Sequence, residues 1–128
     1  MIMTAHTTGF AKSVIFIFIV FCSSAFAQSN AVSTPEERAQ RWDTWMKENL
    51  AITPEQEDPI HTINLKYAQQ NEHLKTSGES RRAKFHELKS SDKQKTTELK
   101  AILTKEQFDL YLAKKKEFQK QLLERRRS

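Results

Sequence analysis

Two short strings decide the fold of this chain: LTKEQ at residues 103–107 and ITPEQ at residues 52–56. Each places a Gln three positions after a Thr. A Thr at a helix N-cap can accept a hydrogen bond from the backbone amide three residues later, and a Gln or Glu there can reach back to the cap's own N–H. TPEE at residues 34–37 has the same form with Glu. The strings therefore predict capping boxes that open three helices, with motif residues Thr34, Thr53, Gln56, Thr104 and Gln107.

Apolar residues follow each predicted helix start at helical spacing, which fixes the face that each helix buries. The chain is rich in Lys, Glu, Gln, Leu and Ala, which favour helices, and it has no alternating β-branched runs. We therefore predict an all-α fold of about four helices. Their apolar stripes are Ala39, Trp42, Met46 and Leu50, then Ile60, Ile63, Tyr67 and Leu74, then Phe85, Leu88, Leu99 and Ile102, and last Phe108, Tyr111, Leu112, Phe118 and Leu122.

Two features interrupt this pattern. Pro59 falls beyond the first turn of the second helix, where it predicts a kink or a restart with Asp58 as the cap. Gly78 predicts the end of that helix, with Ser77 or Ser80 leading into the next.

The third stripe is polar in its middle. Asp92 and Lys95 stand at positions that should face the core, just after Ser90 and Ser91. This stretch fits the helical pattern least well.

The N-terminus predicts a secretory signal peptide. Lys12 precedes an apolar run at residues 14–22, which is shorter than the roughly 20 residues of a membrane-spanning helix. Ala25-Phe26-Ala27 is a small-x-small site, so we expect cleavage after Ala27 and a periplasmic protein without a stable membrane anchor. The alternatives are a single-span anchor and a lipoprotein modified at Cys22, which the bulky preceding residue disfavours.

This cleavage divides the chain into a signal peptide (1–27), a flexible N-terminus (28–33) and a helical domain (34–128). Cys22 is the only cysteine and leaves with the signal peptide, which excludes disulfides, thiolate catalysis and cysteine metal sites in the mature chain.

The composition predicts a thin core and a basic surface. Only 38% of the full chain is hydrophobic, and the fraction falls further when the apolar leader is removed. We expect dimerisation or an extended helical shape to compensate. The formal net charge is +5 at pH 7. An exported protein rarely meets nucleic acid, so the basic balance indicates either a solvated face or attraction for acidic or unfolded polypeptides.

An exported all-α chain with two Leu/Ile-Thr-x-x-Gln strings, each opening a helix, resembles the Spy/CpxP family of periplasmic stress proteins with the LTxxQ motif. The likeness runs from about Thr34 to Leu123, and it departs from the family at Ile52, where the motif has Leu, and at Pro59. The resemblance implies an extended, hairpin-like cradle that dimerises and binds partly unfolded proteins on its concave face without ATP.

Client binding of that kind needs apolar patches rimmed by cations. The candidates are Trp45 with Arg38 and Arg41, and Phe85 with Arg81 and Arg82. Either aromatic residue could instead belong to the core.

Two other classes of function stay open. His61, His73 and His86 are too widely spaced for a compact metal motif, but some proteins of the resembled family bind metals, so a metal-responsive sensor is one alternative. An inhibitory adaptor of an envelope-stress signalling system is another. We predict no enzyme and no cofactor, because no nucleophile and base stand out and the mature chain has no glycine-rich phosphate loop.

Overall fold

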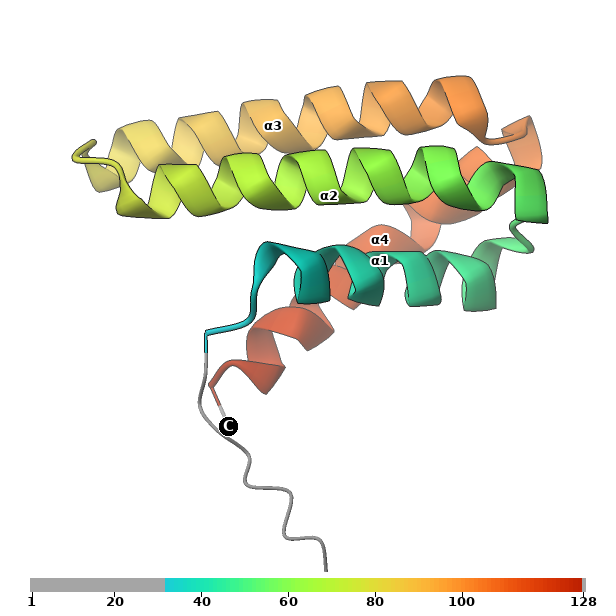
Figure 1. The fold of residues 1–128 in the computed structure, drawn as a ribbon, viewed down its shortest axis with the longest axis horizontal. Coiled ribbons are helices and arrows are strands. Elements are labelled where there is room, and N and C mark those ends of the chain that lie inside the picture. The colour runs from blue at the N-terminus through green and yellow to red at the C-terminus, as the bar shows by residue number, and fades with distance from the viewer. Residues whose placement is uncertain (1–31, 128) are drawn as a thin grey trace, which may run out of the picture. The chain divides into compact units, whose positions relative to one another are not determined.

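The computed structural model describes residues 32–127, which contain four helices and no strand. The predicted all-α class is confirmed (Figure 1). The predicted signal peptide, its cleavage site and residues 28–31 lie outside the described residues. The helices are α1 (Pro35–Leu50), α2 (Pro54–Thr76), α3 (Arg81–Ile102) and α4 (Lys105–Arg125).

The helices begin where the sequence predicts, because each start is set locally. Glu37 and Gln107 donate their backbone N–H groups to the hydroxyls of Thr34 and Thr104, at 3.1 and 3.2 Å, and their side chains accept the N–H of those caps. Ser80 opens α3 by accepting the N–H of Ala83 at 3.2 Å.

The predicted restart at Asp58 is wrong, because α2 continues through Pro59 as one helix of 23 residues. Proline lacks only its own N–H, so a proline near the start of a helix deprives a single carbonyl group of its partner. The Pro59 ring also lies on the exposed side of α2.

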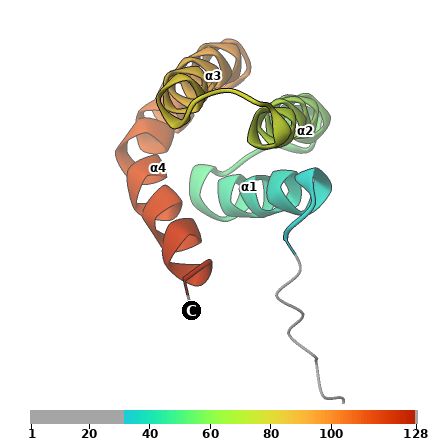
Figure 2. The ribbon, with the colours of Figure 1, turned by 90° about the vertical axis from the view of Figure 1, so that its left-hand side faces the viewer.

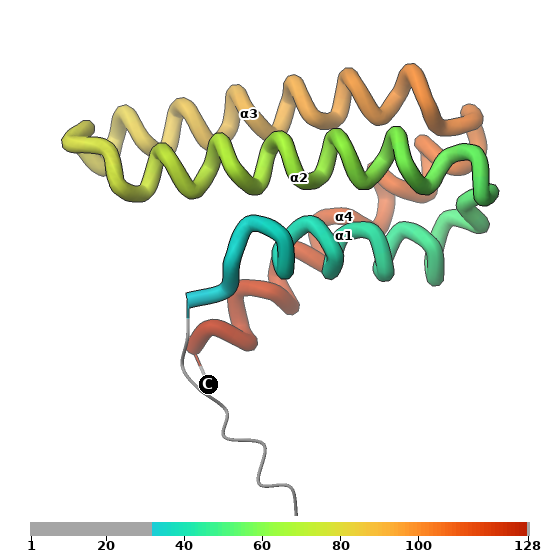
Figure 3. The backbone as a smooth tube through the Cα atoms, viewed as in Figure 1, coloured from blue at the N-terminus to red at the C-terminus, as the bar shows by residue number. Residues whose placement is uncertain are grey.

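Helices α2 and α3 form a hairpin whose arms run side by side (Figure 1). Helix α1 packs most extensively against α2, and α4 contacts both α1 and α3. Figure 2 shows this arrangement from the tip of the hairpin, and Figure 3 follows the chain from α3 through the sharp turn into α4.

The core lies where α2 begins and α3 ends, and it thins toward the tip of the hairpin. Three residues of the predicted stripes are instead exposed: Phe85 by 60%, Leu88 by 42% and Leu112 by 44%. Phe85 and Leu88 lie on α3, so the hairpin carries uncovered apolar side chains beyond the core, and Leu112 lies on α4. The buried cluster comprises Met46, Leu50, Ile60, Ile63, Tyr67, Leu99, Leu103 and Tyr111.

Candidate functional site

The two motif strings meet in space. The Nε2 group of Gln56 donates to Oε1 of Gln107 at 2.8 Å, and Nε2 of Gln107 donates back to Oε1 of Gln56 at 3.0 Å. The starts of α2 and α4 are thus joined by a reciprocal pair of amide hydrogen bonds.

Each glutamine also binds the backbone on both sides of the junction. Gln56 donates to the carbonyl of Ile102 at 3.0 Å, and Gln107 donates to the carbonyl of Ala51 at 3.1 Å. Their Oε1 atoms accept the N–H groups of Thr53 and Thr104. Both side chains are therefore used in holding the two turns together, which is a structural role.

A groove of about 670 Å³ lies between the hairpin and the other two helices. We call it the four-helix groove, because every helix contributes to its lining. The apolar members of the lining are Trp42, Tyr67, Ala68, Leu74, Phe85, Leu88, Leu122 and Leu123.

The charged members of the lining are almost all cations. Asp92 is the one acidic residue among those that line the groove. A concave surface with one sign of charge attracts the opposite sign. The four-helix groove therefore suits an extended ligand that is apolar and negatively charged. Its basic members are Arg38, Arg41, Lys75, Lys84, Lys89, Lys95 and Arg126.

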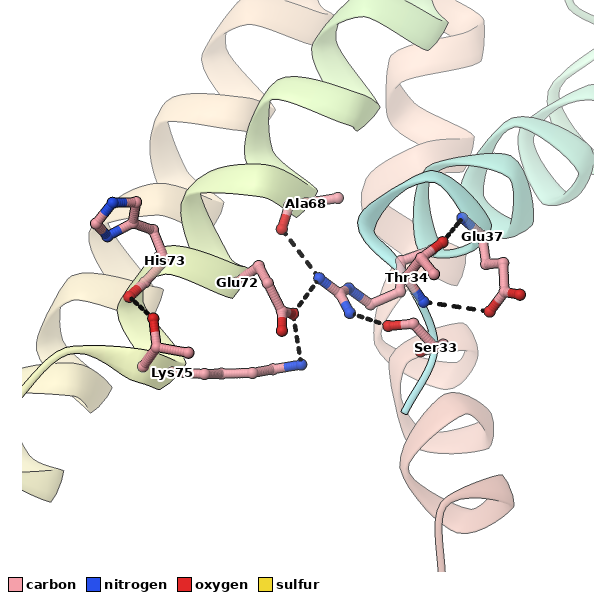
Figure 4. Close-up of polar contacts among 9 residues, drawn as sticks. Ser33, Thr34, Glu37, Ala68, Glu72, His73 and Lys75 are labelled. Carbon is pink, nitrogen blue, oxygen red and sulfur yellow. Dashed lines mark hydrogen bonds and ion pairs between the residues drawn. The ribbon is translucent and has the colours of Figure 1, made fainter. Parts of the chain in front are cut away.

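Arg38 is held in place by the protein itself. Its guanidinium donates to the carboxylate of Glu72 at 2.6 Å, to the carbonyl of Ala68 at 3.1 Å and to the carbonyl of Ser33. Figure 4 shows Glu72 and Lys75 on α2 facing the capped start of α1. Hydrogen bonds from Lys75 and Arg38 lower the pKa of the Glu72 carboxyl. Arg38 thus fastens α1 to α2 and is less available to a ligand than the exposed cations of the rim.

The structure divides the predicted client-binding residues. Three of them, Arg38, Arg41 and Phe85, line the four-helix groove, although they come from different predicted patches. The remaining three, Trp45, Arg81 and Arg82, are not among its lining residues.

Trp45 packs inward against other aromatic rings. It stacks on Phe118 with ring centroids 4.8 Å apart and meets Trp42 edge to face at 5.5 Å. Trp42, which the sequence placed in the core stripe, is the tryptophan that lines the groove. The two are three residues apart on α1, so the helical pattern could not separate their roles.

Sequence reasoning also missed Lys95, which lies at the floor of the four-helix groove. Its side chain is 7% exposed, and its Nζ stands 4.0 Å from the centroid of the Trp42 ring. Burial lowers the pKa of Lys95 to about 7, against the opposing effect of Asp92. The feature of the sequence that could have revealed it is the polar middle of the third apolar stripe, where Asp92 and Lys95 replace apolar residues.

The comparisons with known proteins give one match. A family model described as a domain of unknown function, DUF4890, matches residues 25–111. The chain belongs to the DUF4890 family. The matched stretch of this DUF4890 chain includes both motif strings and ends at Tyr111, within α4. No curated protein and no solved structure matches it.

The other candidate sites gain no support from the geometry. Nδ1 of His61 lies 2.6 Å from the carboxylate of Asp43, but within residues 32–127 no group of three or more His, Cys, Asp or Glu side chains could hold a metal ion. None of the four helices of this DUF4890 chain is long and apolar enough to cross a membrane.

Proposed function

We propose that this DUF4890 protein is an ATP-independent, chaperone-like protein that binds partly unfolded polypeptides in the four-helix groove. The observation that carries the proposal is the lining of the groove, which combines exposed apolar side chains with cations from α1, α2 and α3 and from Arg126, the residue that follows α4. Uncovered apolar surface with a charged rim is typical of a protein-binding site.

The Gln56–Gln107 junction supports the proposal, because it fixes the arrangement of the helices that line the groove. The Gln56–Gln107 pair joins two turns that are far apart in the sequence, so α4 keeps its place beside the hairpin without a large core. Two such Thr-x-x-Gln strings also carry the resemblance to the Spy/CpxP family. We extend the proposal accordingly to a stress protein of the periplasm, exported by a signal peptide that is cleaved after Ala27.

We further propose that the mature protein is a homodimer. Its fraction of apolar residues is low for its length, so a single chain can bury only a small core. Light scattering of residues 28–128 at micromolar concentration tests this. A mass of two chains is the expected result, and a single-chain mass contradicts it.

The binding proposal is tested by the aggregation of a chemically denatured test protein. Purified protein without nucleotide should suppress this aggregation at low salt. The suppression should weaken as salt rises, because screening shortens to about 8 Å at physiological ionic strength.

A matched pair of charge reversals locates the site. Arg41→Glu with Lys89→Glu changes two exposed cations that line the groove, whereas Arg81→Glu with Arg82→Glu changes two exposed cations outside its lining. Both pairs alter the net charge equally and should leave the fold intact, because exposed charges contribute little to stability. We expect the first pair to slow client capture strongly and the second to slow it only slightly. Equal effects would show that overall charge, and not the groove, attracts the client.

A further inference from the structure

We propose that Lys95 is the receptor for an acidic side chain of the bound polypeptide, so that the four-helix groove selects unfolded segments in which an Asp or Glu interrupts apolar residues. This inference rests on the proposed function and names the chemistry of the client. It starts from a cation that the fold buries without giving it an acceptor.

Lys95 has no acceptor of its own. No residue within 32–127 forms a hydrogen bond or an ion pair with its Nζ, whose one described contact is with the face of the Trp42 ring at 4.0 Å. Buried ammonium groups are normally paired or hydrogen-bonded, because an unpaired charge loses its hydration without compensation. Lys95 as a residue is only 7% exposed, but its Nζ is not among the enclosed atoms without a partner, which within residues 32–127 are Asn64 Oδ1 and the Tyr111 hydroxyl, so this Nζ can be reached from the groove.

The nearby carboxylates are already engaged with other donors. Asp43 on α1 accepts from Nδ2 of Asn64 at 2.7 Å and contacts Nδ1 of His61 at 2.6 Å, one with each carboxylate oxygen. Asp92 on α3 accepts from Lys115 at 2.8 Å and from Gln119 at 3.3 Å, again with separate oxygens.

Lys115 is a nearly buried lysine whose ammonium group does have hydrogen-bond acceptors within the protein. Its side chain is 11% exposed, and its Nζ donates to both Asp92 and the hydroxyl of Thr96 at 2.9 Å. Lys95 is buried to a similar degree and has no such partners. An apolar residue at position 95 would serve stability at least as well.

A bound ligand can supply the acceptor that Lys95 lacks within the protein. Lys95 lines the groove, so a ligand that reaches the floor can present a carboxylate to its Nζ. The ring of Trp42 contacts Lys95, and the lining of the same groove includes further apolar side chains, among them Leu88 and Leu122. A single carboxylate flanked by apolar side chains therefore complements the floor and walls, and an unfolded acidic segment supplies both.

Binding should take up a proton. The groups that act on the charge of Lys95 are Asp43 from α1, Asp92 from its own helix and Lys115 from α4, while the Tyr67 hydroxyl of α2 is bonded to Glu98. Burial lowers the pKa of Lys95 to about 7, so much of the free protein is neutral at this position at pH 8. A carboxylate that binds beside Lys95 favours the charged form of its amine, so the amine takes up a proton when the ligand binds.

Calorimetry with two blocked peptides tests the inference. Both consist of Leu, Phe, Ser and Gly, and they differ only in a central Asp or Asn. At pH 8 the Asp peptide should bind about tenfold more tightly or better, as expected for a hydrogen bond between charged groups. Titration in buffers of different ionisation enthalpy should show uptake approaching one proton per peptide.

Lys95→Met should remove both the Asp preference and the proton uptake while retaining binding of the Asn peptide. Lys93→Met is the matched control, because it removes an exposed lysine of the same helix that is not part of the groove lining. It should keep both effects. The proton uptake of the unmutated protein is a second measurement, which holds even if Lys95→Met fails to fold.

The outcomes separate the two proposals. Equal binding of both peptides without proton uptake overturns the role of Lys95 and leaves the proposed function standing. Failure of both peptides and of denatured test proteins to bind overturns both. Acetate that alone causes the proton uptake would contradict a polypeptide ligand and indicate a small carboxylate instead.

Discussion

At the scale of single residues, the two motif strings each open a helix, but they do so through different hydrogen bonds. The Thr104 hydroxyl accepts the N–H of Gln107 at 3.2 Å. At the start of α2, the N–H of Gln56 has the backbone carbonyl of Thr53 as an acceptor at 3.0 Å, a hydrogen bond that does not depend on the Thr53 hydroxyl. The Gln side chain reaches back to its Thr in both cases, so it is the shared element of the two strings.

Removing the two hydroxyls should therefore have unequal effects. Thr104→Ala should lower the free energy of unfolding by about 0.5–2 kcal/mol, because the Gln107 amide loses its acceptor. Thr53→Ala should cost clearly less, since the Gln56 amide keeps its backbone partner. Urea denaturation measures both, with Thr104→Ser as a nearly neutral control. Equal losses would refute this distinction.

Lys95 makes a second prediction at this scale, because its burial links folding to pH. Its pKa is about 7 in the folded protein and about 10.4 in an unfolded chain. Between these values the unfolded chain binds more protons, so raising the pH favours folding. Stability should rise from pH 7 toward pH 10 by up to about 1.4 kcal/mol per unit from this group.

Urea denaturation across that pH range, compared with Lys95→Met, isolates the contribution of Lys95. Lys95→Met should lack this rise, and Lys93→Met should keep it. Parallel stability curves for all three proteins would show that Lys95 does not titrate in this range.

At the scale of the helices, the one non-glycine residue with a positive φ within residues 32–127 lies where α1 ends. Ala51 has φ 50° and ψ 50°, a left-handed conformation that non-glycine residues adopt at a cost. Its carbonyl accepts from Gln107 at 3.1 Å, so the junction holds the turn in this form.

Glycine at this position should relieve the strain. Ala51→Gly should stabilise the protein by up to about 1 kcal/mol, the balance between the cost of left-handed alanine and the greater freedom of unfolded glycine. Ala113→Gly, at an exposed position inside α4, should instead destabilise by about 1 kcal/mol. Thermal denaturation followed by circular dichroism compares them. Destabilisation by Ala51→Gly would mean that the turn carries no strain.

The starts of the helices could be predicted from the sequence because a cap needs only a few neighbouring residues. The extent of α2 could not, since the effect of Pro59 depends on how well the rest of the helix is packed. The environment of the polar positions Asp92 and Lys95 could not be predicted from the sequence either. Their environment comes from other helices, including Lys115 and Gln119 of α4.

At the scale of the whole described domain, the four-helix groove depends on contacts between distant segments. The sequence suggested Arg38, Arg41 and Phe85 but assigned them to two separate patches, whereas the fold brings them to one groove. Helix α4 lines part of this groove and contacts both α1 and α3. The start of α4 is joined to the start of α2 by the Gln56–Gln107 junction, whose partners are 51 residues apart.

The central claim, that the groove binds unfolded polypeptides, is tested most directly by removing its exposed apolar surface. Phe85→Ser with Leu88→Ser changes two groove residues that are 60% and 42% exposed. Leu110→Ser with Leu112→Ser changes two residues of similar exposure, 42% and 44%, outside the lining. Neither pair should unfold the protein, because all four residues are largely exposed and lie outside the buried cluster.

The measurement is light scattering from a denatured test protein diluted into each variant without nucleotide. We predict that the Phe85 and Leu88 variant loses most of the suppression of aggregation, while the Leu110 and Leu112 variant retains it. Full suppression by both variants, or equal loss in both, would contradict the claim that the four-helix groove is the client-binding site.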